Sequence, residues 1–292
     1  MLILFLKSLI FYFLSCLNII GYSSLFIKPY FKINRYCLFS NFIFGSIGII
    51  FISYSLNMFF PLNQYITNSF FIIFTIIGFI KFKKLIFKNL KILFFLVSFA
   101  SLITVLSRSY NDYELYHLPY MELIRSFKII FGLSNLDFRY AHPSVFQNIS
   151  AFQYNQIMRV DSYIFYTVSL FAVSLFYLYR IFKKSQSNII FLISFVSLIY
   201  FLIHGNRYGA LGNDLPTHLL AIISIIMWLQ INTHSYYFRT KQLLFLTIIT
   251  ILILSKFSMI FFILLPLSLM FKKKFIYEKN LFFIILLGLL FL

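Results

Sequence analysis

Residues 241–270, KQLLFLTIITILILSKFSMIFFILLPLSLM, form the apolar stretch that decides how this chain folds. As one helix rising 1.5 Å per residue it would measure about 45 Å, well beyond the ~30 Å hydrocarbon core of a bilayer. Lys256 lies at its middle, within Ser-Lys-Phe-Ser. We therefore predict two short helices, about 242–254 and 257–271, with Lys256 near the outer surface of a membrane.

The same apolar character extends through the rest of the chain. Hydrophobic residues make up 61% of the 292 residues and charged residues only 11%, which no water-soluble domain of this size needs. Runs of about 17–25 apolar residues fit membrane-spanning helices, whereas a barrel would show shorter, alternating segments. The sequence predicts an all-α polytopic membrane protein with about nine to ten transmembrane helices. The other expected spans are 2–26, 36–60, 64–80, 91–107, 162–182, 188–204 and 217–233.

We expect residues 1–292 to form a single transmembrane domain, because no internal repeat or linker suggests a separate soluble unit. The final apolar run, 281–292, is too short to cross a bilayer unaided. The expectation is that either the chain is incomplete at its C-terminus or a partner completes it.

Basic residues set the expected orientation. The formal charge of +18 lies mostly in short loops between spans, which is a topology signal rather than a nucleic-acid-binding pattern. The five basic groups fall on one side of the membrane only if 241–270 enters and returns. Residues 108–161 and 205–216 then lie on the outer side. The groups are Lys28, Lys32 and Arg35; Lys81, Lys83, Lys84, Lys88 and Lys91; Arg180, Lys183 and Lys184; Arg239 and Lys241; and Lys272, Lys273, Lys274 and Lys279.

Carboxylates concentrate in the 108–161 loop, which holds five of the seven acidic residues of the chain. An acidic side chain at a membrane boundary, beside His and Arg, can act as general base to a hydroxyl nucleophile while cations hold a phosphate leaving group. The candidate catalytic residues are Asp112, Glu114 and His117. The competing interpretation is that these charges only solvate a loop.

Two short helices are expected within this loop. Residues 121–133 form an expected amphipathic helix at the membrane interface, with Gly132 as its stop. Its apolar face is expected to comprise Leu123, Phe127, Ile130 and Phe131. Ser144 is a candidate cap for a second helix over 145–158.

Residues 204–218 and Lys256 supply further candidates. Arg207 and Asp214 accompany three glycines that permit close backbone approach to a ligand, although an ordinary turn before the next helix explains the glycines equally well. An unpaired ammonium in an apolar context is unfavourable. Lys256 therefore needs a partner such as Asp214, Asp112 or a phosphate, unless it snorkels to the headgroups.

Several motifs resemble one family. Asp112 with Tyr116-His117-Leu118-Pro119, followed by Gly132-Leu133-Ser134-Asn135-Leu136, resembles a group of bacterial integral membrane proteins related to the GT-C glycosyltransferases. Asp214-Leu215-Pro216, and Lys256-Phe257-Ser258 before Leu264-Leu265-Pro266, are similar to the group's D-x-P and KLS elements. The elements occur in matching order over about residues 100–270. Phe257 replaces the usual Leu, and the chain ends before the large C-terminal soluble region that many GT-C enzymes possess.

The resemblance implies a polyprenyl-phosphate-sugar-dependent glycosyltransferase of the bacterial inner membrane with its active face outward. Its acceptor would be an envelope glycan or lipid, and nucleic acid is not an expected partner. GT-C enzymes carry an essential acid in an outer loop, and Asp112 is the matching position. In that function Arg139, His142 and Lys256 would bind phosphate. The two cysteines lack metal-ligand spacing and no metal site is predicted, but the need for a divalent cation stays open.

Two other functions remain in competition. An O-antigen ligase or polymerase also uses basic outer loops, but it relies on Arg and His more than on a paired Asp and Glu. A lipid-linked saccharide flippase or other transporter should place charges inside several spans. The charges of this chain concentrate in loops, which favours an enzyme over a transporter.

Overall fold

The regular structure of the chain is helical, as the sequence predicts. The computed structural model describes residues 2–30, 38–106, 113–130, 132, 135, 144–156, 158, 160–185, 187–205, 207, 214–233 and 239–271. The helices are α1 (Leu2–Tyr30), α2 (Leu38–Phe59), α3 (Gln64–Lys88), α4 (Leu90–Leu106), η1 (Tyr113–His117), α5 (Leu118–Ser126), α6 (Val145–Phe152), η4 (Val160–Ile164), α7 (Phe165–Lys184), α8 (Asn188–Ile203), α9 (Asp214–Thr233), α10 (Arg239–Ser255), η6 (Phe257–Ile263) and α11 (Leu264–Phe271).

Four segments of the described chain are long and apolar enough to cross a membrane: Leu2–Leu25, Leu38–Phe59, Ser162–Lys184 and Asp214–Thr233. A fifth is added if the bent pair of α3 and α4 counts as one span. Helix α8, α10 and the η6–α11 segment are apolar but shorter. A membrane protein is therefore supported, whereas the expected count of nine to ten spans is not confirmed.

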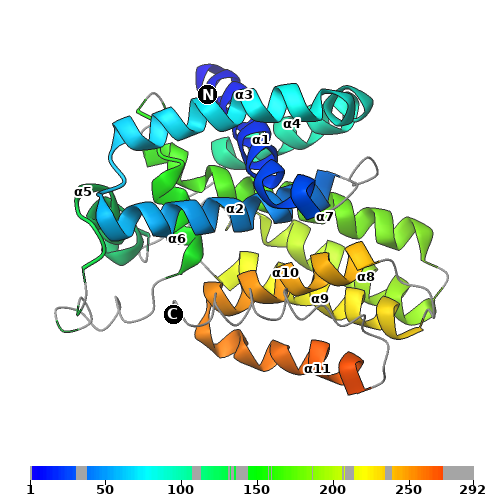
Figure 1. The fold of residues 1–292 in the computed structure, drawn as a ribbon. Helices are drawn as coiled ribbons and strands as arrows, with labels where there is room; N and C mark the ends of the chain where they lie inside the picture. Colours follow the sequence, from blue (N-terminus) through cyan, green and yellow to red (C-terminus); the bar gives the residue numbers. More distant parts are fainter. Residues whose placement is uncertain are drawn as a thin grey trace.

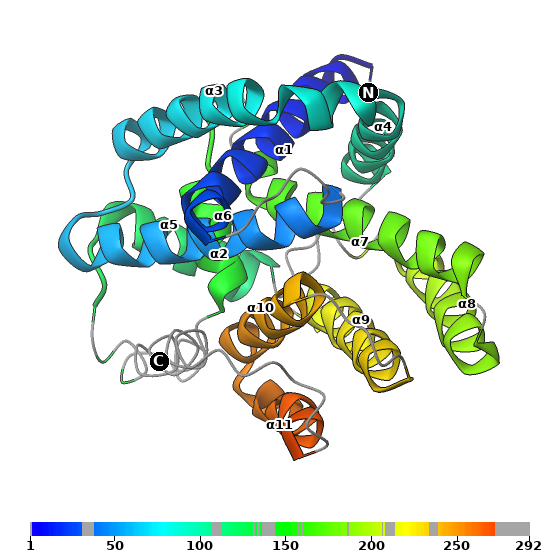
Figure 2. The same cartoon turned by 45° about the vertical axis from the view of Figure 1, so that its right-hand side comes forward.

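Helix α1 crosses between α2 and α3, with α4 and α7 also packed against it (Figures 1 and 2). Three glycines allow this close approach. A Cβ atom on Gly21 would lie 1.9 Å from the backbone oxygen of Phe74, and one on Gly78 would lie 2.1 Å from the oxygen of Leu17. On the α2 side, a Cβ on Gly45 would lie 1.8 Å from the oxygen of Ile19. No side chain fits at these positions, because backbone contacts backbone.

Polar and aromatic contacts fix α1 along its length. The hydroxyl groups of Tyr12 and Thr104 lie 2.6 Å apart, which joins α1 to α4. Asn18 Nδ2 donates to the backbone oxygen of Phe71 on α3 at 2.9 Å. One turn further along, the rings of Tyr22 and Phe74 stack with centroids 3.7 Å apart. The aromatic richness of the chain thus serves packing here.

The basic segment expected as a loop after residue 80 is helical and belongs to α3. Helix α3 continues to Lys88, well past the expected end near residue 80, because Ile86 is buried against the core. Asn89 then ends the helix, and both its backbone N–H and its side-chain Nδ2 donate to the oxygen of Leu85. Helix α4 leaves at an angle of 102° to α3.

The predicted break within 241–270 is confirmed. Helix α10 ends at Ser255, Lys256 has an extended backbone, and the chain continues as the 3-10 helix η6 and then α11. Figures 1 and 2 show α10 and α11 as the two arms of a hairpin that turns at this point. Lys256 therefore lies at the turn between two short apolar helices.

The amphipathic helix of the outer loop exists, but its limits differ from the prediction. Helix α5 begins at Leu118 and ends at Ser126, six residues before Gly132. It ends early because Asn57 binds the residues that follow. Side-chain Nδ2 of Asn57 donates to the backbone oxygen of Phe127, and the backbone oxygen of Asn57 accepts from the N–H of Ile129.

The face of α5 that packs inward contains Met121 and Ile124, which are buried, whereas Phe127 and Ile130 of the expected apolar face follow the end of the helix and are exposed. Helix α6 begins after Ser144, which forms the predicted cap, but it ends at Phe152 instead of 158. The boundaries therefore depend on tertiary contacts that periodicity does not reveal.

We expect Gly21→Ala and Gly78→Ala to destabilise the protein strongly. Each added methyl group forces two helices apart, and overpacking of this kind costs about 1–3 kcal/mol or more. Thermal unfolding in one detergent should show both variants melting below the wild type. Gly205→Ala is the matched control, because a Cβ there would make only an ordinary 3.5 Å contact with Phe171. Equal melting temperatures for Gly21→Ala and Gly205→Ala would contradict the close helix contact.

Candidate functional site

The predicted site residues divide into two sets. Asp112, Arg139 and His142 lie outside the described residues, as does the side chain of Glu114. The side chains of His117, Arg207, Asp214 and Lys256 are described. Asp214 and Lys256 form one ion pair, His117 lies in another cluster, and Arg207 belongs to neither.

His117 belongs to a buried cluster that joins α5 to α6. The residue closes the π-helical turn η1, and Pro119 in the first turn of α5 lacks the N–H group that a regular helix continuing through this point would use. The imidazole is 3% exposed, and its Nδ1 lies 2.6 Å from Nε2 of Gln147 on α6. The ring of Tyr116 contacts it, with centroids 4.0 Å apart.

Tyr120 follows one turn later on the same segment. Burial raises the pKa of Tyr120 to about 12. The phenol therefore stays protonated at physiological pH, so it can donate a hydrogen bond but is not a base.

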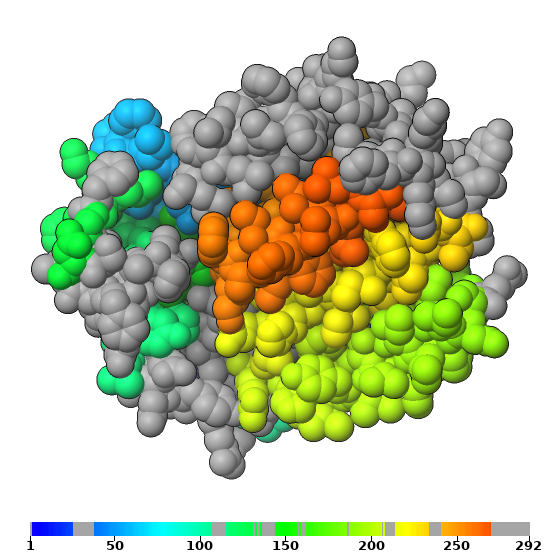
Figure 3. Space-filling view, turned by 90° about the horizontal axis from the view of Figure 1, so that it is seen from below, coloured from blue at the N-terminus to red at the C-terminus, as the bar shows by residue number. Residues whose placement is uncertain are grey.

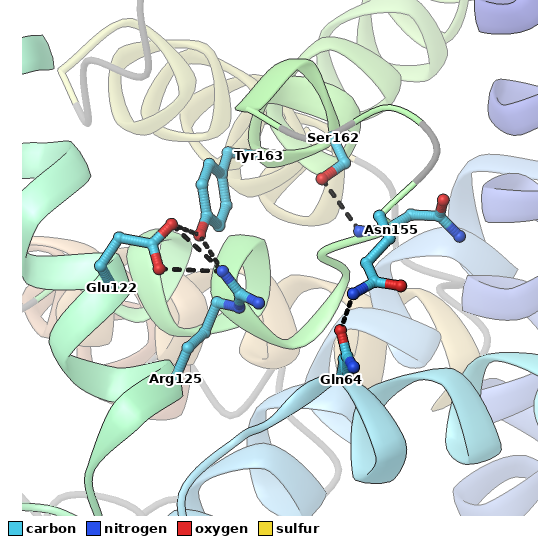
Figure 4. Close-up of polar contacts among 7 residues, drawn as sticks. Gln64, Glu122, Arg125, Asn155, Ser162 and Tyr163 are labelled. Atoms are coloured by element: carbon cyan, nitrogen blue, oxygen red, sulfur yellow. Dashed lines mark hydrogen bonds and ion pairs between the residues drawn. The ribbon is translucent and has the colours of Figure 1, made fainter.

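A second cluster comprises Glu122, Arg125 and Tyr163 (Figure 4). Nη1 of Arg125 donates to the two carboxylate oxygens of Glu122 at 3.1 and 2.9 Å and to the hydroxyl of Tyr163 at 3.0 Å. That hydroxyl in turn donates to Oε1 of Glu122 at 2.5 Å. The Arg125 side chain is only 15% exposed, and the carboxylate neutralises it.

Three further contacts hold this cluster in place. The guanidinium carbon of Arg125 lies 3.4 Å from the centre of the Tyr154 ring, a cation–π contact. Asn57 Nδ2 donates to the backbone oxygen of Ile124 at 3.2 Å, and the N–H of Leu62 donates to the same oxygen. These bonds attach α5 to the turn between α2 and α3.

Asp214 and Lys256 form the third cluster. Nζ of Lys256 lies 2.7 Å from Oδ1 of Asp214, with 44% of the lysine and 65% of the aspartate side chain exposed. Beneath the pair, the hydroxyl groups of Thr217 and Ser255 lie 3.0 Å apart and are buried. The prediction that Lys256 has an acidic partner is confirmed, and the partner is Asp214. The pair joins the start of α9 to the turn after α10.

Arg207 is exposed and forms no hydrogen bond or ion pair with another described side chain. Within the described residues, no group of three or more His, Cys, Asp and Glu side chains is placed to hold a metal ion.

Several residues that the structure places in these clusters were not site candidates in the sequence, among them Glu122. Tyr163 lies 38 residues from Arg125, and neither residue was a site candidate. Gln147 had one local signal, because it stands three residues after the cap Ser144, in the spacing of a capping box. That spacing predicts a helix start but not a contact with His117.

The family model described as "Domain of unknown function (DUF8201)" matches residues 1–292. The chain belongs to this DUF8201 family. No curated protein and no solved structure matches the chain. Because the description of DUF8201 assigns no function, a function for this DUF8201 chain has to be argued from its residues.

We expect Tyr163→Phe to destabilise this DUF8201 protein by about 1.5–3 kcal/mol. The change removes a hydroxyl that bonds two charged groups, and hydrogen bonds to charged groups contribute about that much. Thermal unfolding in one detergent is the measurement. Tyr65→Phe is the matched control, because the Tyr65 side chain is 76% exposed. A Tyr163→Phe protein as stable as Tyr65→Phe would show that the cluster contributes nothing to stability.

Proposed function

We propose that this DUF8201 chain is a membrane glycosyltransferase that moves a sugar from a polyprenyl-phosphate carrier to an envelope glycan or lipid. We place it in the bacterial inner membrane with its active face outward. The proposal follows from the GT-C resemblance of Asp112, the YHLP stretch, Asp214 and Lys256.

The observation that carries the proposal is the position of Lys256 beside an exposed apolar stripe. Phe257, Phe261 and Leu264 follow it at helical spacing and are 70%, 72% and 59% exposed. In Figure 3, the orange surface of α10, η6 and α11 continues into the yellow surface of α9 and the yellow-green surface of α8. A cation next to a long apolar surface suits a lipid that carries a phosphate headgroup and an isoprenoid chain.

A phosphate that binds Lys256 would have to replace the Asp214 carboxylate. Since both side chains of the pair are largely exposed, their bond contributes little to stability. A carrier phosphate can therefore replace Asp214 on the ammonium without leaving a buried charge unpaired. The prenyl chain would then lie along Phe257, Phe261 and Leu264 in contact with membrane lipid.

The reaction itself is assigned to the outer loop. The acceptor hydroxyl oxygen attacks the anomeric carbon of the sugar, and the bond from that carbon to the phosphate oxygen breaks. The carrier phosphate leaves with the electron pair, and Asp112 accepts the acceptor's proton. Glu114 is the neighbour of Asp112. The candidate cations for phosphate and sugar are Arg139, His142 and Arg207.

The arrangement of helix ends supports an outward site. In Figure 1 the end of α2 and the start of α3 lie on the left with α5 and α6, and the α10–η6 turn also lies at the left end of its hairpin. The α7–α8 connection, with the basic residues Arg180, Lys183 and Lys184, lies on the right. We propose that α1–α4, α7–α10 and the η6–α11 segment are nine spans. The apolar run 281–292 lies outside the described residues.

The test is an assay of the purified full chain in lipid nanodiscs with a panel of radiolabelled polyprenyl-phosphate sugars. The proposal expects label to move from the carrier to an acceptor with at least one donor. In sealed vesicles, label that crosses the membrane while still attached to its carrier would instead indicate a flippase. No transfer with any donor would contradict the proposal.

Lys256→Met should weaken binding of the donor about 10- to 100-fold, because a charge-assisted hydrogen bond contributes about 1.5–3 kcal/mol. Lys256→Arg should keep part of the affinity, since the charge is kept and the geometry changes. Lys84→Met is the control, because Lys84 is exposed near the end of α3 and lies outside the three clusters. The measurement is donor affinity in folded, inserted protein. Unchanged affinity in Lys256→Met would leave Lys256 as a snorkelling residue.

Asp112→Asn should lower turnover about 100- to 10,000-fold, the contribution of a general base. Donor affinity should change far less, because cations rather than this carboxylate hold the phosphate. Glu114→Gln is the matched control and should cost less. Turnover and donor affinity are measured side by side for both variants. Full activity in Asp112→Asn would remove the base from the mechanism.

A further inference from the structure

The orientation of the Gln147 amide is fixed by a backbone donor. The N–H of Ser144 lies 3.1 Å from Oε1 of Gln147, one half of the capping box that begins α6. A backbone N–H can only donate, so the atom of Gln147 that faces it must be the oxygen. The amide nitrogen of Gln147 therefore points the other way, toward His117.

That nitrogen lies 2.6 Å from Nδ1 of His117. An amide NH₂ group donates and does not accept, so Nδ1 of His117 must be the acceptor. A neutral imidazole with an unprotonated Nδ1 carries its proton on Nε2. An imidazolium ion would instead place an N–H group on Nδ1 against the N–H of the amide, where the two donors repel.

We propose that Gln147 is a positioning residue that keeps His117 neutral, with its proton on Nε2. His117 then serves the site as a hydrogen-bond donor to an oxygen acceptor, and it is neither a cation nor a base. The proposal deepens the proposed function. Only the identity of the oxygen acceptor rests on that function. It leaves the acid–base work of the transfer to the carboxylates of the outer loop.

The charged side chains of α5 and α6 are bonded to one another. Helix α6, VFQNISAF, carries no charged residue, and Tyr120 on α5 stays protonated because burial raises its pKa. Among the described side chains of η1, α5 and α6, the one carboxylate is Glu122, which is already bonded to Arg125 and Tyr163. The aromatic ring that contacts His117 belongs to Tyr116.

Gln147→Glu separates this role from a structural one. Glutamate has nearly the shape of glutamine, and its carboxylate still accepts the Ser144 N–H, since Ser-x-x-Glu is also a capping box. It cannot donate to His117, however, so it draws a proton onto Nδ1. The helix cap is kept while the hydrogen bond to the ring is reversed.

The experiment is ¹⁵N NMR of the full chain, labelled at histidine, in lipid nanodiscs at pH 5.5 and 7.5. The His117 signals are assigned by their loss in His117→Gln. The wild type should show a pyridine-type Nδ1 and a pyrrole-type Nε2 at both pH values, although a free imidazole is about nine-tenths protonated at pH 5.5. Gln147→Glu should show a pyrrole-type Nδ1. A protonated Nδ1 in the wild type, or an unchanged spectrum in Gln147→Glu, would overturn the proposal.

Ser144→Ala is the matched control, because it removes the serine hydroxyl that caps α6 but keeps the backbone N–H that orients Gln147. Its His117 signals should stay those of the wild type even if the protein melts at a lower temperature. A changed tautomer in Ser144→Ala would show that helix capping in general, and not the Gln147 amide, controls the ring. Since the readout needs no substrate, it is independent of the glycosyl-transfer assay.

Discussion

Direct backbone contact of α1 with α2 and α3 is the constraint on which the rest of the fold depends. Inside a lipid bilayer, apolar helices gain little by hiding from water, so association relies on close packing of small residues. Gly21, Gly45 and Gly78 provide that packing. A Cβ added at any of them would lie within about 2 Å of a backbone oxygen of the facing helix. Once α1 is held on two sides, its buried residues define the surface on which α4 and α7 pack.

The elements that the sequence predicted well are those decided by local chemistry. The break at Lys256 follows from one ammonium in a long apolar run, and the cap at Ser144 follows from a hydroxyl before a helix. The ends of α3 and α5 depend on distant residues instead. Ile86 is buried against the core and extends α3, and Asn57 binds the chain just after α5 and ends it. Periodicity contains no information on those contacts.

The site shows the same division, for a reason of chemistry. Asp214 could be predicted as a partner of Lys256, because this apolar chain contains only seven carboxylates that could pair with the ammonium group. Gln147 was not foreseeable as a partner of His117, since an imidazole can bond any hydroxyl, amide or backbone group nearby. Tyr163 is one of 21 tyrosines, so nothing in the sequence marks it as the partner of Arg125. Rare charges identify their partners, whereas common neutral groups do not.

Helix α6 connects the parts of the proposed site. An isolated helix of eight residues is unstable, so α6 depends on its capping box and on its complete burial. It packs against α5, which follows His117, and against α10, which ends beside Lys256. Because the polar groups of α6 are neutral, they can be buried between these helices without an ionic partner.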